Sequence, residues 1–219
     1  MLYVVATPIG NLQDITLRAL ETLKSVDVIY AEDTRRTKQL LTHFSIAKPV
    51  YSLHQHSADS KLAEVVCALG DGKSVAYVTD AGTPGIQDPG GKLVEYCRDN
   101  GYQAVPIPGP SAITALLSVA GIPADEFHFS GYAPTKKGRE TFIKKILTHS
   151  TPTVFFETSP RLLKLFDQLI ALGAGERTLV VGRELTKKFE DIQFGYVQEL
   201  KAHYLENPPK GELVITLTV

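Results

Sequence analysis

The sequence predicts an α/β protein of two domains, the first built on a largely parallel sheet and the second on a mixed sheet. Short apolar runs alternate with segments of helical periodicity through the first half of the 219 residues, which is typical of strand–helix–strand units. The strands in this half are apolar almost throughout, as in Val75-Ala76-Tyr77-Val78, and such strands fit a sheet that is covered on both faces. In the second half, the predicted strands follow one another more closely in the chain, so partly antiparallel pairing is expected.

The first half contains five predicted strands and four predicted helices. The strands are at residues 2–6, 26–31, 50–53, 74–79 and 103–106, and the helices are at 16–25, 34–44, 60–69 and 90–100. A further helix is predicted at 111–120, because a Pro-Gly-Pro turn precedes it and Gly121-Ile122-Pro123 stops it. We interpret it as a connection, which gives an N-terminal α/β domain at 1–110, a linking helix at 111–123 and a C-terminal α/β domain at 124–219. In that last domain, strands are predicted at 127–130, 151–157, 178–183, 190–196 and 212–218, and helices at 136–148, 160–172 and 197–204.

Composition and charge narrow the class of protein. The formal net charge of −1 argues against a protein that coats nucleic acid through a global basic field, although a local basic patch remains compatible with RNA binding. No run of about 18 apolar residues occurs, so no membrane span is expected. Cys67 and Cys97 lie far apart and lack the paired spacing of a zinc or redox motif. We interpret them as buried free thiols of a cytoplasmic protein.

Three loops rich in glycine and proline follow predicted strands of the first sheet, at residues 7–12, 79–91 and 106–112. Ligands of open α/β sheets bind beyond the carboxyl ends of the strands. Any one of these loops alone is better explained as a tight turn, but three at one sheet edge favour a ligand site. Neither the dinucleotide-binding G-x-G-x-x-G nor the phosphate-binding G-x-x-x-x-G-K-[ST] pattern is present, so a dinucleotide-binding fold and an NTPase are disfavoured.

Two charged clusters also follow predicted strands. The cluster at residues 31–38 fits acid–base catalysis or phosphate binding, but its composition slightly favours a helix start with Asp33 or Thr34 as the N-cap and the basic residues solvated. The cluster at 182–188 fits the same chemistry or a loop with surface ion pairs. His54 and His56 have the spacing of two metal ligands but no third, so we expect no metal site.

Five motifs occur in order along the chain, at residues 3–12 (YVVATPIGNL), 31–35 (AEDTR), 79–86 (TDAGTPGI), 108–112 (PGPSA) and 183–187 (RELTK). Together they closely resemble the motifs of the ribosomal RNA small subunit methyltransferase I family, within the tetrapyrrole methylase superfamily. The resemblance covers essentially the whole chain. Each motif is modest alone, whereas the set is highly specific.

The resemblance implies a homodimer of the tetrapyrrole-methylase type that binds S-adenosylmethionine in a donor cleft between its two α/β domains. It implies 2′-O-methylation of a cytidine ribose in the decoding centre of 16S rRNA, as naked RNA or in the assembled 30S subunit. The residues that it places at the donor are Pro8, Asp80, Gly82, Thr83, Pro84, Ile86, Ser111, Ala112, Phe156, Glu157, Leu185 and Gly211. Many members continue beyond the last strand into a helical extension thought to help grip RNA, whereas this sequence stops at Val219.

Methyl transfer to a ribose hydroxyl requires that the oxygen be aligned and deprotonated. Our hypothesis is that Asp33 or Glu32 takes the proton, and that Arg35 or Lys187 steadies the oxygen or the adjoining phosphate. The expected RNA contacts are Arg35, Arg36 and Lys38, then Lys136, Lys137 and Arg139, and finally Lys187 and Lys188, although each run is also a normal solvated surface. Two alternatives remain: methylation of a tetrapyrrole intermediate or of diphthine, and a non-catalytic module that binds a nucleotide or S-adenosylmethionine.

Overall fold

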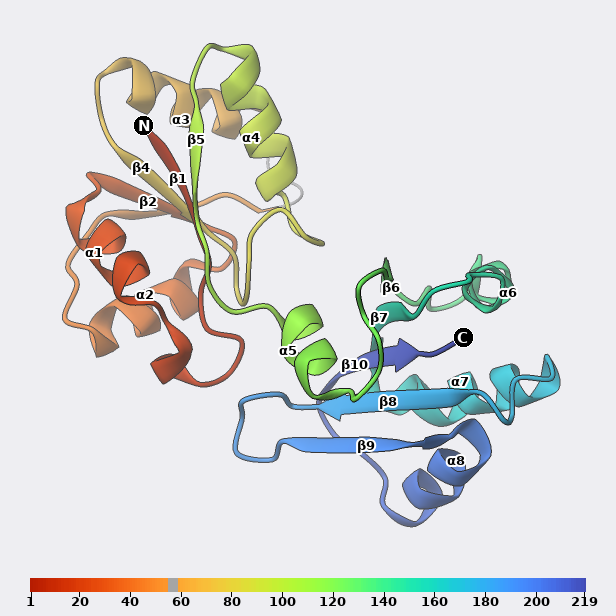
Figure 1. Ribbon diagram of the computed structural model, residues 1–219. Helices are drawn as coiled ribbons and strands as arrows, with labels where there is room; N and C mark the ends of the chain where they lie inside the picture. Colours follow the sequence, from red (N-terminus) through yellow and green to blue (C-terminus); the bar gives the residue numbers. More distant parts are fainter. Residues whose placement is uncertain (55–58) are drawn as a thin grey trace. The chain divides into compact units, whose positions relative to one another are not determined.

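The computed structural model describes residues 1–54 and 59–219, and they divide into two compact units, Met1–Ser111 and Ala112–Val219 (Figure 1). His56, one of the two histidines considered as metal ligands, lies outside the described residues. Among the described residues, no helix combines the length and the apolar character needed to cross a membrane.

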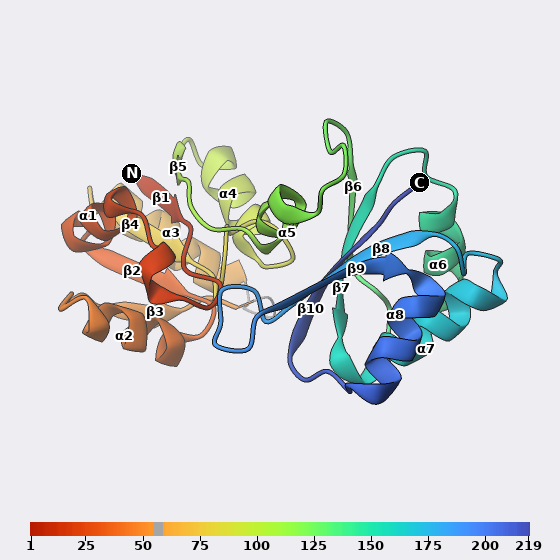
Figure 2. The same cartoon turned by 60° about the horizontal axis from the view of Figure 1, so that its bottom comes forward.

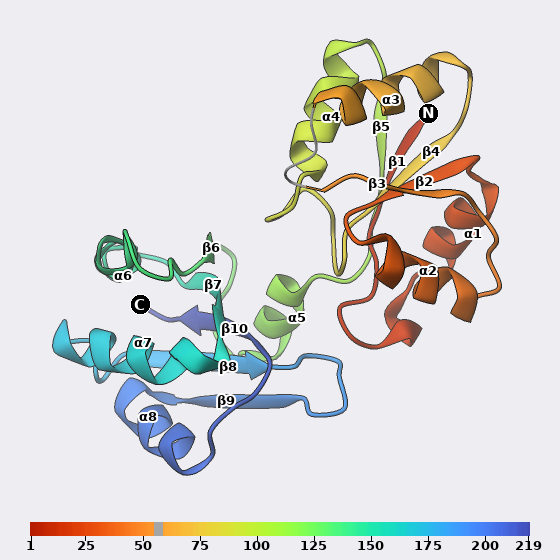
Figure 3. The same ribbon diagram turned by 180° about the vertical axis from the view of Figure 1, so that it is seen from behind.

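The described part of the first unit has one parallel sheet with the strand order β3-β2-β4-β1-β5. Its elements lie close to the predicted positions, so the predicted strand–helix alternation is confirmed. Figure 3 shows β3 at the edge of the sheet, next to β2. The strands are β1 (Leu2–Val5), β2 (Val28–Ala31), β3 (Val50–Ser52), β4 (Val75–Val78) and β5 (Ala104–Ile107). The helices are the short 3₁₀ helix η1 (Leu12–Asp14), then α1 (Leu17–Ser25), α2 (Thr34–His43), α3 (Asp59–Gly70) and α4 (Gly90–Asp99).

Helices cover both faces of this sheet, as the apolar strands predict (Figure 1). On one face, α1 and α2 pack Leu23 and Leu41 against strand residues such as Ile29. On the other face, α3 and α4 pack their apolar side chains, including Leu62 and Leu93, against the alternate strand residues. All four residues of β2 and of β4 are buried, because these two strands have a neighbour on each side and helices on each face.

Local chemistry sets the helix ends of this unit. Helix α1 begins where the Thr16 side chain accepts a hydrogen bond from the Ala19 amide at 3.1 Å. Helix α4 ends before Gly101, whose φ of +83° is the left-handed conformation that glycine adopts most readily at a helix end. The prediction that both cysteines are buried is wrong for Cys67, which is exposed on α3, whereas Cys97 on α4 is buried.

The second unit has a mixed sheet with the strand order β6-β7-β10-β8-β9 among its described residues, as predicted. Only β6 and β7 pair in parallel, and the other three pairs are antiparallel. The strands are β6 (His128–Tyr132), β7 (Thr153–Thr158), β8 (Thr178–Arg183), β9 (Asp191–Tyr196) and β10 (Glu212–Leu217). The helices are α5 (Ala112–Val119), α6 (Arg139–Leu147), α7 (Ser159–Ala171) and α8 (Val197–Glu206).

One apolar core joins α6, α7 and α8 to this sheet, with Phe155, Phe166 and Tyr204 among its largest buried side chains. Figures 2 and 3 show α7 and α8 side by side. Helix α5, which we expected to link two domains, packs against β10 of the second unit. Helix α6 begins three residues later than predicted, because Gly138 before it adopts a left-handed φ of +84°.

Candidate functional site

The three glycine- and proline-rich loops of the first unit meet at the carboxyl edge of its sheet. Thr7 and Gly82 form an isolated antiparallel bridge, with N–O distances of 3.0 and 2.9 Å between their backbones. The Thr83 hydroxyl donates to the Pro110 carbonyl oxygen at 3.2 Å, which connects the second loop to the third. The expectation of three loops at one edge is therefore met, and their backbones are fixed to one another.

Close packing at this junction requires glycine at position 109. A Cβ added to Gly109 would lie 2.9 Å from the Ala6 Cβ, which is closer than real Cβ atoms approach. Gly82 adopts a φ of +83° at the bridge to Thr7, a conformation that other residues rarely take. Both glycines therefore hold loop backbones close to the strand ends.

The Asp88 carboxylate shapes the second loop from within. It accepts hydrogen bonds from the amides of Gly85 at 2.8 Å, Ile86 at 3.1 Å and Gly90 at 2.7 Å. Three amides that would otherwise need water are thus satisfied by one carboxylate. The turn that results leaves the Ile86 side chain 43% exposed, as an apolar surface on the loop.

The charged segment after β2 is joined to the same edge. The Asp33 amide donates to Asp80 Oδ1 at 2.9 Å, and the Thr79 hydroxyl donates to Glu32 Oε2 at 2.8 Å. The Arg36 guanidinium lies 3.5 Å from Asp80 Oδ2. Residues from two predicted sites, the 31–38 cluster and the 79–91 loop, thus form one group of polar side chains.

Asp33 is the N-cap of α2, so the helix-start interpretation of this segment is confirmed. Its carboxylate accepts from the Arg35 amide at 2.8 Å and from the Arg35 side chain at 2.8 and 3.2 Å. These hydrogen bonds from Arg35 lower the pKa of Asp33 from 3.8 to about 2. A carboxylate with so low a pKa is a weak proton acceptor, which counts against Asp33 as the base.

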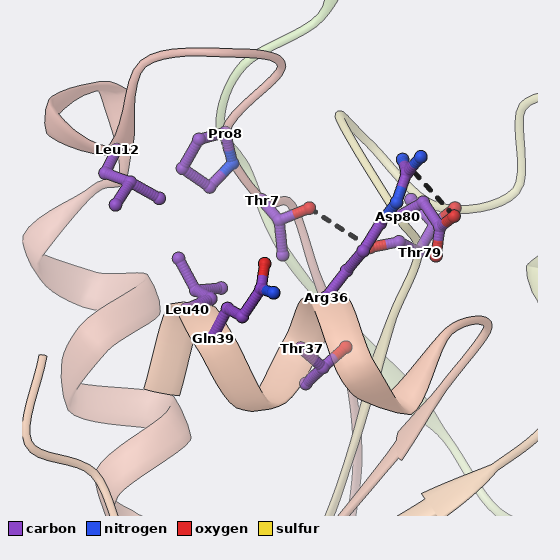
Figure 4. A pocket seen from close by; sticks show the side chains of 9 residues that line it. All are labelled: Thr7, Pro8, Leu12, Arg36, Thr37, Gln39, Leu40, Thr79 and Asp80. Carbon is purple, nitrogen blue, oxygen red and sulfur yellow. Dashed lines mark hydrogen bonds and ion pairs between the residues drawn. The ribbon is translucent and has the colours of Figure 1, made fainter. Parts of the chain in front are cut away.

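A pocket of about 210 Å³ lies between α2 and the loop that follows β1 (Figure 4). Figure 4 shows the first turn of α2 on one side and the Thr7–Pro8 loop on the other, with Arg36 extending toward Asp80. The pocket includes two residues expected at the donor, Pro8 and Asp80, and one expected at RNA, Arg36. Its lining consists of Thr7, Pro8, Leu12, Arg36, Thr37, Gln39, Leu40, Thr79 and Asp80.

In the second unit, the expected donor residues gather at one end of the sheet. In the strand register, Leu213 of β10 is opposite both Glu157 of β7 and Arg183 of β8. Gly211, just before β10, and Leu185, just after β8, therefore lie at the same end as Glu157. Phe156 lies beside them in β7, with its ring 5.0 Å from that of Tyr132. Ala112 is the first residue of α5, directly after Ser111 at the end of the first unit.

Lys187 is held between two carboxylates at this end. Its Nζ lies 3.0 Å from Glu184 Oε1 and 2.9 Å from Glu212 Oε2. Burial acts to lower the pKa of Lys187, but these hydrogen bonds outweigh it and raise the pKa. Lys187 therefore remains protonated, and the surface-ion-pair interpretation of the 182–188 cluster describes it correctly.

The backbone of this cluster is strained. Glu184 has a φ of +49° and Thr186 a φ of +66°, although non-glycine residues, and β-branched ones above all, rarely adopt this region. Glu184 Oε1 also accepts the Glu212 amide at 2.9 Å, which connects the strained turn to β10. Strain of this kind is concentrated at functional sites.

Glu157 and Arg139 form a buried ion pair, with Arg139 Nη1 2.6 Å from Glu157 Oε2 and side chains 3% and 0% exposed. The expectation that Arg139 contacts RNA from the surface is therefore wrong: α6 turns this guanidinium inward, where it neutralises the Glu157 carboxylate. Lys136 and Lys137, in the loop before α6, are exposed. Arg161 approaches the other oxygen of Glu157, with its Nε 2.6 Å from Oε1.

Sequence reasoning missed Asp88, Glu184 and Arg161, whose side chains fix the loops and strand ends. A signal existed for Asp88, since aspartate two residues before Gly90 at a helix start often bonds to nearby amides. No sequence pattern indicated the role of Arg161, because its partner Glu157 lies on the preceding strand. Among the described residues, no three His, Cys, Asp or Glu side chains are grouped so that they could hold a metal ion.

Comparison with known proteins identifies the family to which this chain belongs. The family model for tetrapyrrole (corrin/porphyrin) methylases matches residues 1–201. A relative from Escherichia coli O157:H7, ribosomal RNA small subunit methyltransferase I, is 46% identical over 98% of this chain and 76% of its own length. The protein of the same name from Thermotoga maritima is 41% identical over 99% of this chain and 97% of its own. The chain belongs to the tetrapyrrole methylase family, in the group of ribosomal RNA small subunit methyltransferase I.

Solved structures of other proteins have the same fold. Diphthine synthase matches with a TM-score of 0.76 at 17% identity, over 99% of this chain and 89% of its own. Uroporphyrin-III-C-methyltransferase from Thermus thermophilus matches with a TM-score of 0.69 at 19% identity, over 98% of this chain and 93% of its own. At such identities the likeness concerns the fold alone.

Proposed function

We propose that this protein is an S-adenosylmethionine-dependent methyltransferase that methylates the ribose 2′-oxygen of a cytidine in the decoding centre of 16S rRNA. The observation that carries the proposal is the identity of 41–46%, over nearly the whole chain, to relatives named ribosomal RNA small subunit methyltransferase I. The junction of the three loops supports it, because it supplies a site at the sheet edge where ligands of α/β proteins bind.

The residues of this junction suit the methyl donor. An apolar surface for a flat ring is available at Ile86, and Asp80 offers a carboxylate that is 30% exposed. Loop backbones fixed by Gly82 and Gly109 can be approached closely by a ligand. The proposed donor residues remain Pro8, Asp80, Gly82, Thr83, Pro84, Ile86 and Ser111 of the first unit, with Ala112, Phe156, Glu157, Leu185 and Gly211 of the second. The bound donor supplies an activated methyl group on a positively charged sulfur.

The protein must align the ribose hydroxyl and accept its proton. Of the two proposed bases, Glu32 suits the role better than Asp33, because the Asp33 carboxylate is already committed to capping α2 and to Arg35. The Thr79 hydroxyl holds Glu32 Oε2 at 2.8 Å and so fixes its orientation. Lys187 and Arg35 carry the positive charge proposed to steady the developing oxyanion or the adjoining phosphate.

The RNA contacts in this proposal are surface cations. They are Arg35, Arg36 and Lys38 beside the first-unit site, and Lys136, Lys137, Lys187 and Lys188 in the second unit. The Arg35 side chain is 87% exposed, so its bond to Asp33 leaves donors free for a phosphate. Each phosphate contact releases counterions, so binding of 30S subunits should weaken steeply as salt rises. The same proposal includes a homodimer in the cytoplasm, acting on 16S rRNA or the assembled 30S subunit.

The test is methyl transfer from labelled S-adenosylmethionine to 30S subunits taken from a strain without the endogenous enzyme. Label on the ribose of a decoding-centre cytidine supports the proposal. Donor binding without label on 30S subunits or naked 16S rRNA rejects the acceptor, and a tetrapyrrole or diphthine would then be assayed. Absence of any S-adenosylhomocysteine with all of these acceptors would indicate a non-catalytic binding module.

A further inference from the structure

The pocket between α2 and the loop after β1 contains one polar side chain that makes no hydrogen bond to the described part of the protein. The Gln39 amide makes no hydrogen bond to any residue within 1–54 or 59–219, and its side chain is exposed. The hydroxyls on the same lining are all occupied: Thr7 donates to the Thr79 carbonyl, Thr79 to Glu32, and Thr37 to the Asp33 carbonyl. Gln39 therefore offers a donor and an acceptor side by side.

Three of the other lining residues are apolar, namely Pro8, Leu12 and Leu40. In Figure 4 the Gln39 amide points from α2 toward the Thr7–Pro8 loop, with Leu40 beside it and Leu12 farther away, near Pro8. An apolar wall next to an amide is complementary to a flat ring whose edge has a donor adjacent to an acceptor.

Size and position restrict the ligand further. A volume of about 210 Å³ is below the roughly 300–1,000 Å³ of sites that enclose a whole drug-sized ligand, so it suits one ring system rather than the entire donor. Two of the proposed donor residues, Pro8 and Asp80, are themselves part of the lining, so a ring in this pocket would lie next to the donor. Arg36, a proposed phosphate contact, forms its opposite side.

We propose that this pocket receives the base of the target nucleotide, a pyrimidine, and that the Gln39 amide reads its edge. In a cytosine, Gln39 Oε1 would accept from the exocyclic amino group while Nε2 donates to the neighbouring ring nitrogen, the two-bond pattern by which amide side chains read bases. Enzymes that act on one nucleotide take its base out of the stack and hold it against apolar side chains. The inference deepens the proposed function and rests on it.

The experiment compares Gln39→Ala and Gln39→Glu with the wild-type protein, using 30S subunits as acceptor. Gln39→Ala removes the amide, whereas Gln39→Glu keeps its size and one acceptor but loses the donor. The matched control is Gln13→Ala, an exposed glutamine of η1 whose side chain is not part of the pocket lining. The KM for 30S subunits and the kcat are measured by label transfer, and the Kd for S-adenosylmethionine is measured by calorimetry.

We expect both Gln39 variants to raise the KM for 30S subunits about 5- to 100-fold, with the Kd for S-adenosylmethionine within twofold of wild type and Gln13→Ala unchanged. An unaltered KM in Gln39→Ala overturns the inference and leaves the proposed function intact. A Kd for S-adenosylmethionine that rises with the KM also overturns it, because the pocket would then belong to the donor. If wild-type protein transfers no label to 30S subunits, the proposed function fails, and the inference fails with it.

Discussion

The buried ion pair at the end of β7 gives a quantitative prediction for the variant Glu157→Gln. The Glu157 carboxylate accepts from Arg139 Nη1 at 2.6 Å and from the Thr158 amide at 2.8 Å. Its Oε1 also lies 2.6 Å from Arg161 Nε, which donates its hydrogen bond to the Thr158 hydroxyl. Glutamine has nearly the same volume, but it carries no charge and places a donor NH₂ where one carboxylate oxygen accepted. Arg161 is 20% exposed and can turn toward water, whereas Arg139 at 3% cannot. We therefore expect the free energy of unfolding to fall by about 3–5 kcal/mol, the usual effect of removing one partner of a buried pair.

Urea titration followed by far-ultraviolet circular dichroism measures this loss. The matched control is Glu140→Gln, since Glu140 pairs with Lys144 at 2.6 Å but is 73% exposed, so its replacement should leave the free energy of unfolding nearly unchanged. A loss below about 1 kcal/mol for Glu157→Gln would refute the reasoning, because Arg139 would then not depend on this carboxylate. Weaker S-adenosylmethionine binding in Glu157→Gln at unchanged stability would instead indicate direct contact between Glu157 and the donor.

Three further predictions concern the loops and the titrating groups. Asp88→Ala removes the acceptor of three loop amides, so it should lower the free energy of unfolding by about 1–2 kcal/mol. It should also weaken the binding of S-adenosylmethionine, because the loop would lose its fixed shape. An unchanged affinity in calorimetry would contradict the donor role of this loop. Because its pKa is lowered from 3.8 to about 2, Asp33 should stabilise the fold above about pH 4 and lose this contribution progressively as the pH falls to about 2. A carboxyl NMR titration with a midpoint near 4 would contradict this. Burial raises the pKa of Cys97 to about 11, whereas Cys67 is exposed, so Ellman's reagent should modify one thiol per folded chain and two only in denaturant.

The elements of this protein could be predicted closely from its sequence, for reasons that are local. The strand β8 was predicted with its observed bounds, because its apolar run is bordered by charged residues on both sides. The helix α2 was predicted within one residue, because Asp33 is a strong N-cap followed by apolar residues at helical spacing. The late start of α6 was missed because it depends on the left-handed conformation of Gly138, which sequence alone does not fix.

The two errors about burial share one cause, which is that burial depends on neighbours distant in sequence. Arg139 belongs to a basic run and was therefore expected at the surface, yet α6 brings it to the carboxylate of Glu157, 18 residues later in the chain. Cys67 follows two valines and was expected inside, yet it lies on the exposed side of α3. A shift of about two residues along a helix, roughly half a turn, moves a side chain from the core to solvent, and only the packed structure decides which side faces the core.

The sequence by itself determined the strand–helix order, the parallel and mixed sheets, and the motifs that indicate the family, because apolar periodicity, caps and turn residues act over a few neighbouring positions. Only the tertiary structure decided which of those motifs touch. It joined Thr7 to Gly82 and the Asp33 amide to Asp80, and it left the Gln39 amide without a hydrogen-bond partner among the described residues, on a pocket wall. These contacts span from a few dozen to more than seventy residues of chain, and strand order in the sheet, rather than any local propensity, sets them.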